Sequence, residues 1–250
     1  MNQITRIRLG VNIDHVATLR NARGTFYPDP LKMVKFLEKL DVDGVTIHLR
    51  EDRRHIIDSD VKRIKKETFL PVNLEMAATE EMQQIATEVI PNAVCLVPEK
   101  REERTTEGGL DVITEENKLQ SFLVPLIQKK IRISLFVSPD LKQIEAASRV
   151  GANIIELNTG TFCDLLIENN KEYLEEFEKL KEAAIYGKTL GLEIHGGHGL
   201  TFDSVKYIAS IPEIRELNIG HFLISQAVFD GIEKTINTMR LEIDNSQKNR

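Results

Sequence analysis

The sequence predicts an α/β protein, most simply a (β/α)8 TIM barrel with extra helices. Short apolar or β-branched runs alternate with longer helical patterns along the whole chain, which is typical of parallel βαβ units. Eight such runs occur in 250 residues, and eight units in about 250 residues is the size of this barrel. No linker rich in Pro, Gly or Ser divides the chain, so we expect residues 1–250 to form a single domain.

The expected strands are apolar runs, and the expected helices have recognisable ends. The strand segments are 7–13, 44–49, 71–76, 93–98, 132–137, 153–158, 192–196 and 216–220. Helical candidates with Ser, Thr or Asp near the start, or Gly near the end, include 29–40, 79–90, 138–152 and 171–191. The segment NIDHVATLRNARG after the first strand is interpreted as a turn. It lacks the G-x-G-x-x-G of a doubly wound sheet, which is the structural alternative.

The composition excludes several classes of protein. The formal net charge of -6 argues against a general nucleic-acid binder, which would carry a basic stripe. The first ten residues lack a signal-peptide pattern, and no apolar run approaches the roughly 20 residues of a membrane span. We therefore expect a cytoplasmic protein with no membrane partner. Cys95 and Cys163 indicate neither a disulfide framework nor a cysteine-ligated zinc.

The strands are polar on alternate positions, which is unusual for parallel strands buried on both faces. Successive side chains point to opposite faces of a strand, so each run divides into an apolar and a polar set. The polar sets are Asn12 and Asp14, His48 and Arg50, Asn73 and Glu75, Glu156 and Asn158, Glu193 and His195, and Asn218. If the apolar sets meet the helices, the polar sets point into the barrel. Burying so many ionisable groups is costly, so we expect an enzyme with a polar cavity.

Glycines, arginines and histidines cluster where the strands end. The glycine-rich stretches GGHGLT (196–201) and NIGH (218–221) follow the last two strands, a common place for phosphate binding in this fold. Arg20 and Arg23, with Arg50, Arg53 and Arg54, form a basic group on the early loops. A solvated charged face is the alternative for Arg53 and Arg54. The long polar segment VPEKREERTTEGGLDV is interpreted as a mobile lid or an ordinary surface insertion.

All six histidines fall at or near strand ends, which suits proton transfer. They are His15, His48, His55, His195, His198 and His221. A metal centre is the rival interpretation, but neither H-E-x-x-H nor a tight carboxylate–histidine spacing is present. We therefore expect no catalytic metal.

Taken together, these motifs resemble those of the pyridoxine 5′-phosphate synthase family over almost the whole chain. The motifs are NIDHVATLRNARG, GVTIHLREDRRHI, NLEMA, LVPEKREERTTEGGLDV, SLFV, GGHGLT and ELNIGH. The resemblance implies a (β/α)8 barrel with extra helices, assembled from dimers into an octamer. It also implies a transferase of vitamin B6 biosynthesis that needs no cofactor. Such an enzyme condenses 1-deoxy-D-xylulose 5-phosphate with 3-amino-2-oxopropyl phosphate to form pyridoxine 5′-phosphate, inorganic phosphate and water.

The resemblance also implies roles for individual residues. Residues expected to bind the aminoketone phosphate are Asn12, Arg23, Gly199, Gly220 and His221. Those expected to bind the deoxyxylulose phosphate are Asp14, His15, Arg50, His55 and Thr105. His48 and Glu75 match the general bases, His198 matches the general acid, and Glu156 matches a group that tunes the transition state.

The chain departs from the family pattern at two positions. ELNTG stands where E-I-H-T-G is expected, and HGGH stands where Asn-x-Gly-His is expected. Asn158 and His195 have inward parity on adjacent strands, so we hypothesise that they touch and are exchanged as a pair. Two other functions stay open: a sugar-phosphate isomerase or aldolase, and an inactive barrel that binds phosphometabolites. A Schiff-base aldolase would require a buried lysine, and only Lys100 lies near a strand end.

Overall fold

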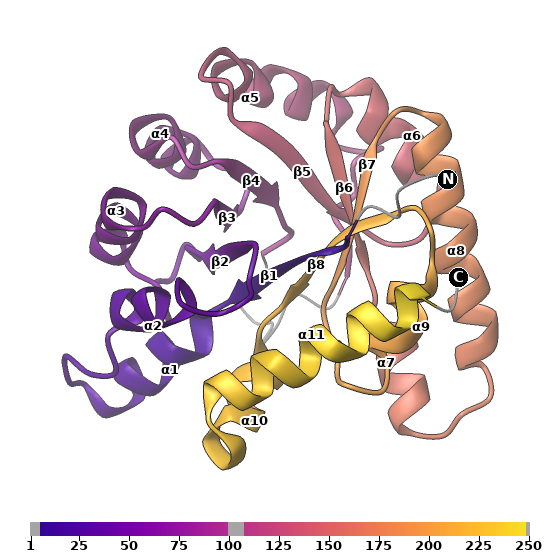
Figure 1. Ribbon diagram of the computed structural model, residues 1–250. Helices are drawn as coiled ribbons and strands as arrows, with labels where there is room; N and C mark the ends of the chain where they lie inside the picture. The colour runs from indigo at the N-terminus through magenta and orange to yellow at the C-terminus, as the bar shows by residue number, and fades with distance from the viewer. Residues whose placement is uncertain (1–5, 100–107, 249–250) are drawn as a thin grey trace.

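The computed structural model describes residues 6–99 and 108–248. Its parallel strands close into one barrel in sequential order, from β1 to β8 and back to β1, with the helices around the outside (Figure 1). The strands are β1 (Arg8–Asn12), β2 (Gly44–His48), β3 (Val72–Met76), β4 (Ala93–Leu96), β5 (Arg132–Val137), β6 (Ile154–Asn158), β7 (Glu193–Gly197) and β8 (Ile214–Ile219). All eight predicted strand segments are confirmed.

The helices that the described residues form outnumber the strands. They are α1 (Asp14–Arg23), α2 (Pro30–Leu37), α3 (Asp58–Glu67), α4 (Glu80–Val89), α5 (Glu116–Gln128), α6 (Leu141–Arg149), α7 (Gly160–Ile167), α8 (Tyr173–Thr189), α9 (Val205–Ser210), α10 (His221–Asp230) and α11 (Ile232–Lys248). Two helices lie between β1 and β2, two between β6 and β7, and two after β8. The prediction of a barrel with extra helices is confirmed. None of these helices combines the length and the apolar character that crossing a membrane requires.

The prediction of a turn after the first strand is wrong, because residues 14–23 form helix α1. Asp14 stands in its first turn, where a carboxylate favours the helix dipole, and Gly24 ends it with φ 69°, a left-handed conformation that suits glycine. Arg20 and Arg23 therefore lie on a helix rather than on a loop.

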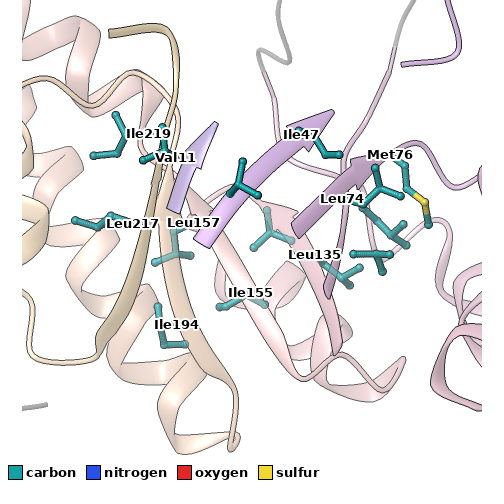
Figure 2. Packing of buried hydrophobic residues seen from close by; sticks show 14 of the residues in the cluster. Val11, Ile47, Leu74, Met76, Leu135, Ile155, Leu157, Ile194, Leu217 and Ile219 are labelled. Atoms are coloured by element: carbon teal, nitrogen blue, oxygen red, sulfur yellow. The ribbon is translucent and has the colours of Figure 1, made fainter. Parts of the chain in front are cut away.

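Strand parity divides the barrel wall into an apolar outside and a polar inside, as predicted. Val11, Ile47, Leu74 and Ile155 are fully buried and pack with their neighbours in the core between strands and helices (Figure 2). Burying one such side chain is worth about 1.5–3 kcal/mol, so this layer carries much of the stability.

The inside of the barrel carries polar side chains in register. Thr46 donates to Asn218 Oδ1 at 2.9 Å, and Asn218 Nδ2 donates to Glu156 Oε2 at 2.7 Å. Glycine allows these side chains their space: a Cβ on Gly10 would lie 2.1 Å from Asn218 Oδ1, and one on Gly197 would lie 2.3 Å from Glu156 Oε1. The polar interior is therefore built by strand parity together with glycines.

Helix α11 fixes the N-terminal end of the barrel. It packs against α9 and α10, and its Arg240 reaches back to β1. The Arg240 side chain is 5% exposed and binds Asp43 at 2.8 Å; it also donates to the carbonyl of Ile7 at 2.7 Å. The end of the chain thus holds the first strand in place at the face opposite the strand carboxyl ends.

Candidate active site

The candidate active site lies at the carboxyl ends of the strands, where the expected site residues gather. Asn12 ends β1, His48 ends β2 and Glu75 stands one residue before the end of β3. Glu75 pairs in register with His48. The loop after β7 carries His198, and Gly220 with His221 begins α10. Parallel strands bring these carboxyl ends to one face, which is where barrel enzymes place their chemistry.

Asp14, just after β1, links the ends of β1 and β2 through hydrogen bonds. Its Oδ1 accepts from the backbone N–H of His48 at 2.8 Å, and its Oδ2 accepts from Asn12 Nδ2 at 2.8 Å. His55 Nδ1 lies 3.9 Å from Asp14 Oδ1. Burial, which outweighs the nearby Asp14 charge, lowers the pKa of His55, so its ring favours the neutral form. Asp14, His48 and His55, which were expected to have different roles, therefore lie close together.

His48 stands between two carboxyl groups. Its Nε2 lies 2.8 Å from Glu99 Oε1, and its Nδ1 lies 3.8 Å from Glu75 Oε2. Asn12 Nδ2 also donates to Glu75 Oε2 at 3.4 Å. His48 and Glu75, the two expected bases, are therefore neighbours.

Glu75 and Glu156 are two acidic side chains of the polar interior; Glu156 is buried and Glu75 is partly buried. Burial, with the charges of Glu156 and Asp14, raises the pKa of Glu75 well above its usual range. Burial also raises the pKa of Glu156 to about 7, although His195 and the hydrogen bond from Asn218 oppose this change. Both carboxyls therefore have raised pKa values, and such groups can serve as acids and bases in a reaction.

His198 adopts a backbone conformation that only a constrained loop maintains. Its φ is +79° and that of Gly199 is +78°, a left-handed region that non-glycine residues adopt at a cost. The Thr159 hydroxyl donates to the carbonyls of Gly197 at 2.9 Å and His198 at 2.5 Å. The His198 ring lies 6.3 Å from that of Phe136. Strain at an exposed turn of the active face is an independent indication of function.

The second glycine cluster adjoins Asn12 and His15. A Cβ on Gly220 would lie 2.8 Å from Asn12 Cβ, so only glycine permits this close approach. The His221 ring lies 4.7 Å from the His15 ring, and burial together with His221 lowers the pKa of His15. The first N–H groups of α10 have no partner within the helix, and such groups favour anions. Asn12, His15, Gly220 and His221 therefore lie together, as a phosphate site requires.

The basic residues predicted on the early loops separate into different roles. Arg20 is buried and binds Asp60 through two hydrogen bonds of 2.8 Å, so it is a structural residue rather than a ligand-binding one. Arg53 binds Asp58 and Arg54 binds Asp52, which favours the charged-face alternative. Arg50 is 3% exposed.

Of the two remaining expected site residues, Arg23 and Thr105, the structure describes only Arg23. Arg23 lies exposed in the last turn of α1. Thr105, Lys100 and the middle of the expected lid lie outside the described residues.

The hypothesis that Asn158 and His195 touch is only partly supported. Both are buried, with 7% and 4% exposure. The register, however, pairs His195 with Glu156, and Asn158 with Gly197, which makes Asn158 and His195 diagonal rather than facing neighbours. His195 contacts Glu193 at 2.8 Å and Glu216 at 3.5 Å. Direct contact stays a hypothesis.

Two residues outside the expected catalytic and binding sets contact members of those sets. Glu99, which the sequence reasoning missed, binds His48, and Asn218, which strand parity directs inward, binds Glu156. Glu99 has the same parity as Cys95 and Val97, so extending the parity of β4 past its end would have found it. One group among the described residues could hold a metal ion, namely Asp14, His48 and His55. It joins segments far apart in the sequence, which is why motif spacing did not reveal it.

Comparisons with known proteins agree with this geometry. The family described as "Pyridoxal phosphate biosynthesis protein PdxJ" matches residues 9–245. A pyridoxine 5'-phosphate synthase of Ruegeria pomeroyi is 52% identical over 245 residues, covering 98% of this chain and 99% of the relative. The enzyme of the same name from Roseobacter denitrificans is 53% identical, covering 98% of each chain.

Solved structures are similar in fold at low sequence identity. The 3-keto-L-gulonate-6-phosphate decarboxylase from Vibrio cholerae superposes with a TM-score of 0.67 at 10% identity, covering 96% of this chain and 99% of the other. Phosphoribosyl anthranilate isomerase superposes with a TM-score of 0.56 at 14% identity, covering 97% and 99%. These show the barrel fold alone. The sequence matches, over nearly the whole length, show that the chain belongs to the PdxJ family of pyridoxal phosphate biosynthesis proteins.

Proposed function

We propose that the protein is a pyridoxine 5′-phosphate synthase. It condenses 1-deoxy-D-xylulose 5-phosphate with 3-amino-2-oxopropyl phosphate to form pyridoxine 5′-phosphate, inorganic phosphate and water. The observation that carries this proposal is the set of His48, Glu75 and Glu156 on the inward face of the strands, with the pKa values of both glutamates raised. The names of the relatives support the same activity.

The reaction needs several proton transfers, and the site offers groups for them. The amine attacks a ketone and water leaves, phosphate departs, and an aldol-type closure followed by dehydration makes the ring aromatic. His48 and Glu75 serve as bases, and His198, on its strained loop, serves as the acid that protonates a leaving group. Glu156, when ionised, stabilises positive charge on the nitrogen-containing intermediates.

Two binding regions position the substrates. Asn12, Gly220 and His221, with Gly199 on the β7 loop, bind the aminoketone phosphate, and Arg23 joins them. Asp14, His15, Arg50 and His55, with Thr105, bind the deoxyxylulose phosphate. The closeness of the His15 and His221 rings supports two neighbouring regions, and positioning alone can supply a large part of a rate enhancement.

One assay tests the activity. The purified protein is mixed with both substrates, and phosphate release and the absorbance of the pyridoxine ring are followed together. We expect product with the parent protein, a loss of at least about 100-fold with His198→Ala or Glu75→Gln, and little change with Arg132→Gln at the far end of the barrel. Absence of product from the parent would overturn the proposal.

The assembly and location belong to the same proposal. We expect a single-domain chain that forms an octamer from dimers in the cytoplasm and uses no cofactor. Analytical ultracentrifugation of the purified protein checks the assembly. A monomer at micromolar concentration would contradict it.

A further inference from the structure

Glu99 is a buried carboxylate with two partners that face the site. Its side chain is 5% exposed. Glu99 Oε1 lies 2.8 Å from His48 Nε2, and Glu99 Oε2 accepts from the backbone N–H of Glu51 at 3.0 Å. Both oxygens are thus fixed, one by the loop after β2 and one by the histidine at the end of β2. A carboxylate held at both oxygens can orient the ring that it contacts.

Glu99 is ionised in this setting. Burial alone would raise its pKa, but the hydrogen bond from His48, the Glu51 N–H and the charge of Arg50 lower it. An ionised carboxylate only accepts hydrogen bonds. The proton between Glu99 and His48 therefore belongs to His48 Nε2.

The other ring nitrogen faces the reaction. With the proton on Nε2, neutral His48 carries its lone pair on Nδ1, and Nδ1 lies 3.8 Å from Glu75 Oε2. Burial and the charges of Glu156 and Asp14 raise the pKa of Glu75, which makes its carboxylate a stronger base. Glu99 therefore holds the Nε2 side of the His48 ring, and Nδ1 is left on the side of Glu75.

We propose that Glu99 is a positioning residue that fixes His48 in the Nε2-protonated tautomer and thereby makes Nδ1 the atom that accepts protons during the reaction. Only the expected effect on kcat rests on the proposed function. The tautomer is inferred from the contacts of His48 with Glu99 and holds whatever reaction the protein catalyses. The arrangement has the logic of a carboxylate that orients a catalytic histidine.

The tautomer is measured directly in the resting protein. Magic-angle-spinning ¹⁵N NMR of protein labelled in its histidine rings distinguishes protonated from unprotonated nitrogens, and His48→Gln assigns the signal by its loss. We expect His48 to carry its proton on Nε2 in the parent. Glu99→Gln should mix the two tautomers, because an amide can donate as well as accept, and Glu99→Asp should restore part of the Nε2 form. A parent His48 protonated on Nδ1 would overturn the proposal, whether or not the protein has the proposed activity.

Kinetics then separates positioning from general stability. Glu99→Gln should lower kcat at least about 100-fold, in the range that general acid–base catalysis contributes, with little change in KM, and Glu99→Asp should recover part of the loss. Asp43→Asn is the matched control, because it removes a carboxylate from an ion pair at the opposite end of the barrel. It should lower the melting temperature and leave kcat and the tautomer unchanged. Full kcat in a folded Glu99→Gln protein would refute the role. If that variant fails to fold, Glu99→Asp decides by its tautomer ratio.

Discussion

Replacing Glu156 by Gln should stabilise the protein above neutral pH and abolish its activity. The Glu156 side chain is buried, at 3% exposure, and burial raises its pKa from 4.5 to about 7. In the unfolded chain this carboxyl ionises near its ordinary pKa. The folded state therefore loses stability as the pH rises from about 4.5 to about 7, and the loss persists at higher pH.

The size of the effect follows from the shift. At about 1.4 kcal/mol per pH unit, the change in the pKa of Glu156 corresponds to about 3 kcal/mol. The favourable interaction with His195 is lost in the variant, whereas a Gln oxygen still accepts from Asn218. We therefore expect a net gain of about 1–3 kcal/mol, or about 2–12 °C in melting temperature for a chain of this size.

Thermal unfolding at two pH values tests this reasoning. Glu156→Gln should melt above the parent at pH 8 and close to it at pH 5, where the parent carboxyl is protonated. Glu216→Gln is the matched control: burial raises the pKa of Glu216, but His195 and Arg8 lower it further, below its usual range. Its loss should therefore destabilise the protein at pH 8. A Glu156→Gln protein that is less stable at pH 8, or equally stabilised at both pH values, would refute the argument.

Four further predictions follow from the same structure. Arg240→Met should lower the free energy of unfolding by about 3–5 kcal/mol, measured by denaturant titration, because it leaves Asp43 without its 2.8 Å partner; an unchanged midpoint would contradict this. His195→Gln should move the acid limb of the kcat profile up by about one pH unit, since His195 lowers the pKa of Glu156, whereas Arg132→Gln should leave the profile in place. The double variant Asn158→His/His195→Asn should be more active than either single variant. If the losses of activity of the single variants add up in the double variant, the two residues are not an exchanged pair. Dialysis against a chelator should leave activity intact, and recovery only on adding a divalent cation would assign a metal to the site.

Strand parity explains how much of the fold and site the sequence could predict. Side chains alternate between the two faces of any strand, so the sequence alone predicts that Glu75 and Glu156 point inward, whatever the neighbouring strands are. The barrel itself followed from the number and spacing of the runs. These features are local, and local patterns are read directly from a sequence.

The parts that sequence reasoning missed depend on contacts between distant segments. Arg20 was expected among the ligand-binding arginines, but its partner Asp60 lies 40 residues away and no spacing rule links them. Helix α1 is missed because its mixed polar pattern gives a weak helical signal. Asp14 in its first turn and Gly24 at its end are the sequence features that indicate a helix there. Glu99 belongs to the segment interpreted as a lid. Its contact with His48 spans 51 residues, so no local pattern indicates it.

The acidic side chains inside the barrel have different surroundings at its two ends. At the N-terminal end, Glu193 and Glu216 contact Arg8 and His195, and the two glutamates have lowered pKa values because cations surround them. One layer above, the charges that act most on Glu75 are those of other acids. A barrel built for stability alone would place a cation beside Glu75 as well. Holding Glu75 among acids raises its pKa, and it favours a substrate that develops positive charge at nitrogen during the reaction. The distribution of charge along the barrel axis therefore supports ring formation from an amine at this end of the barrel.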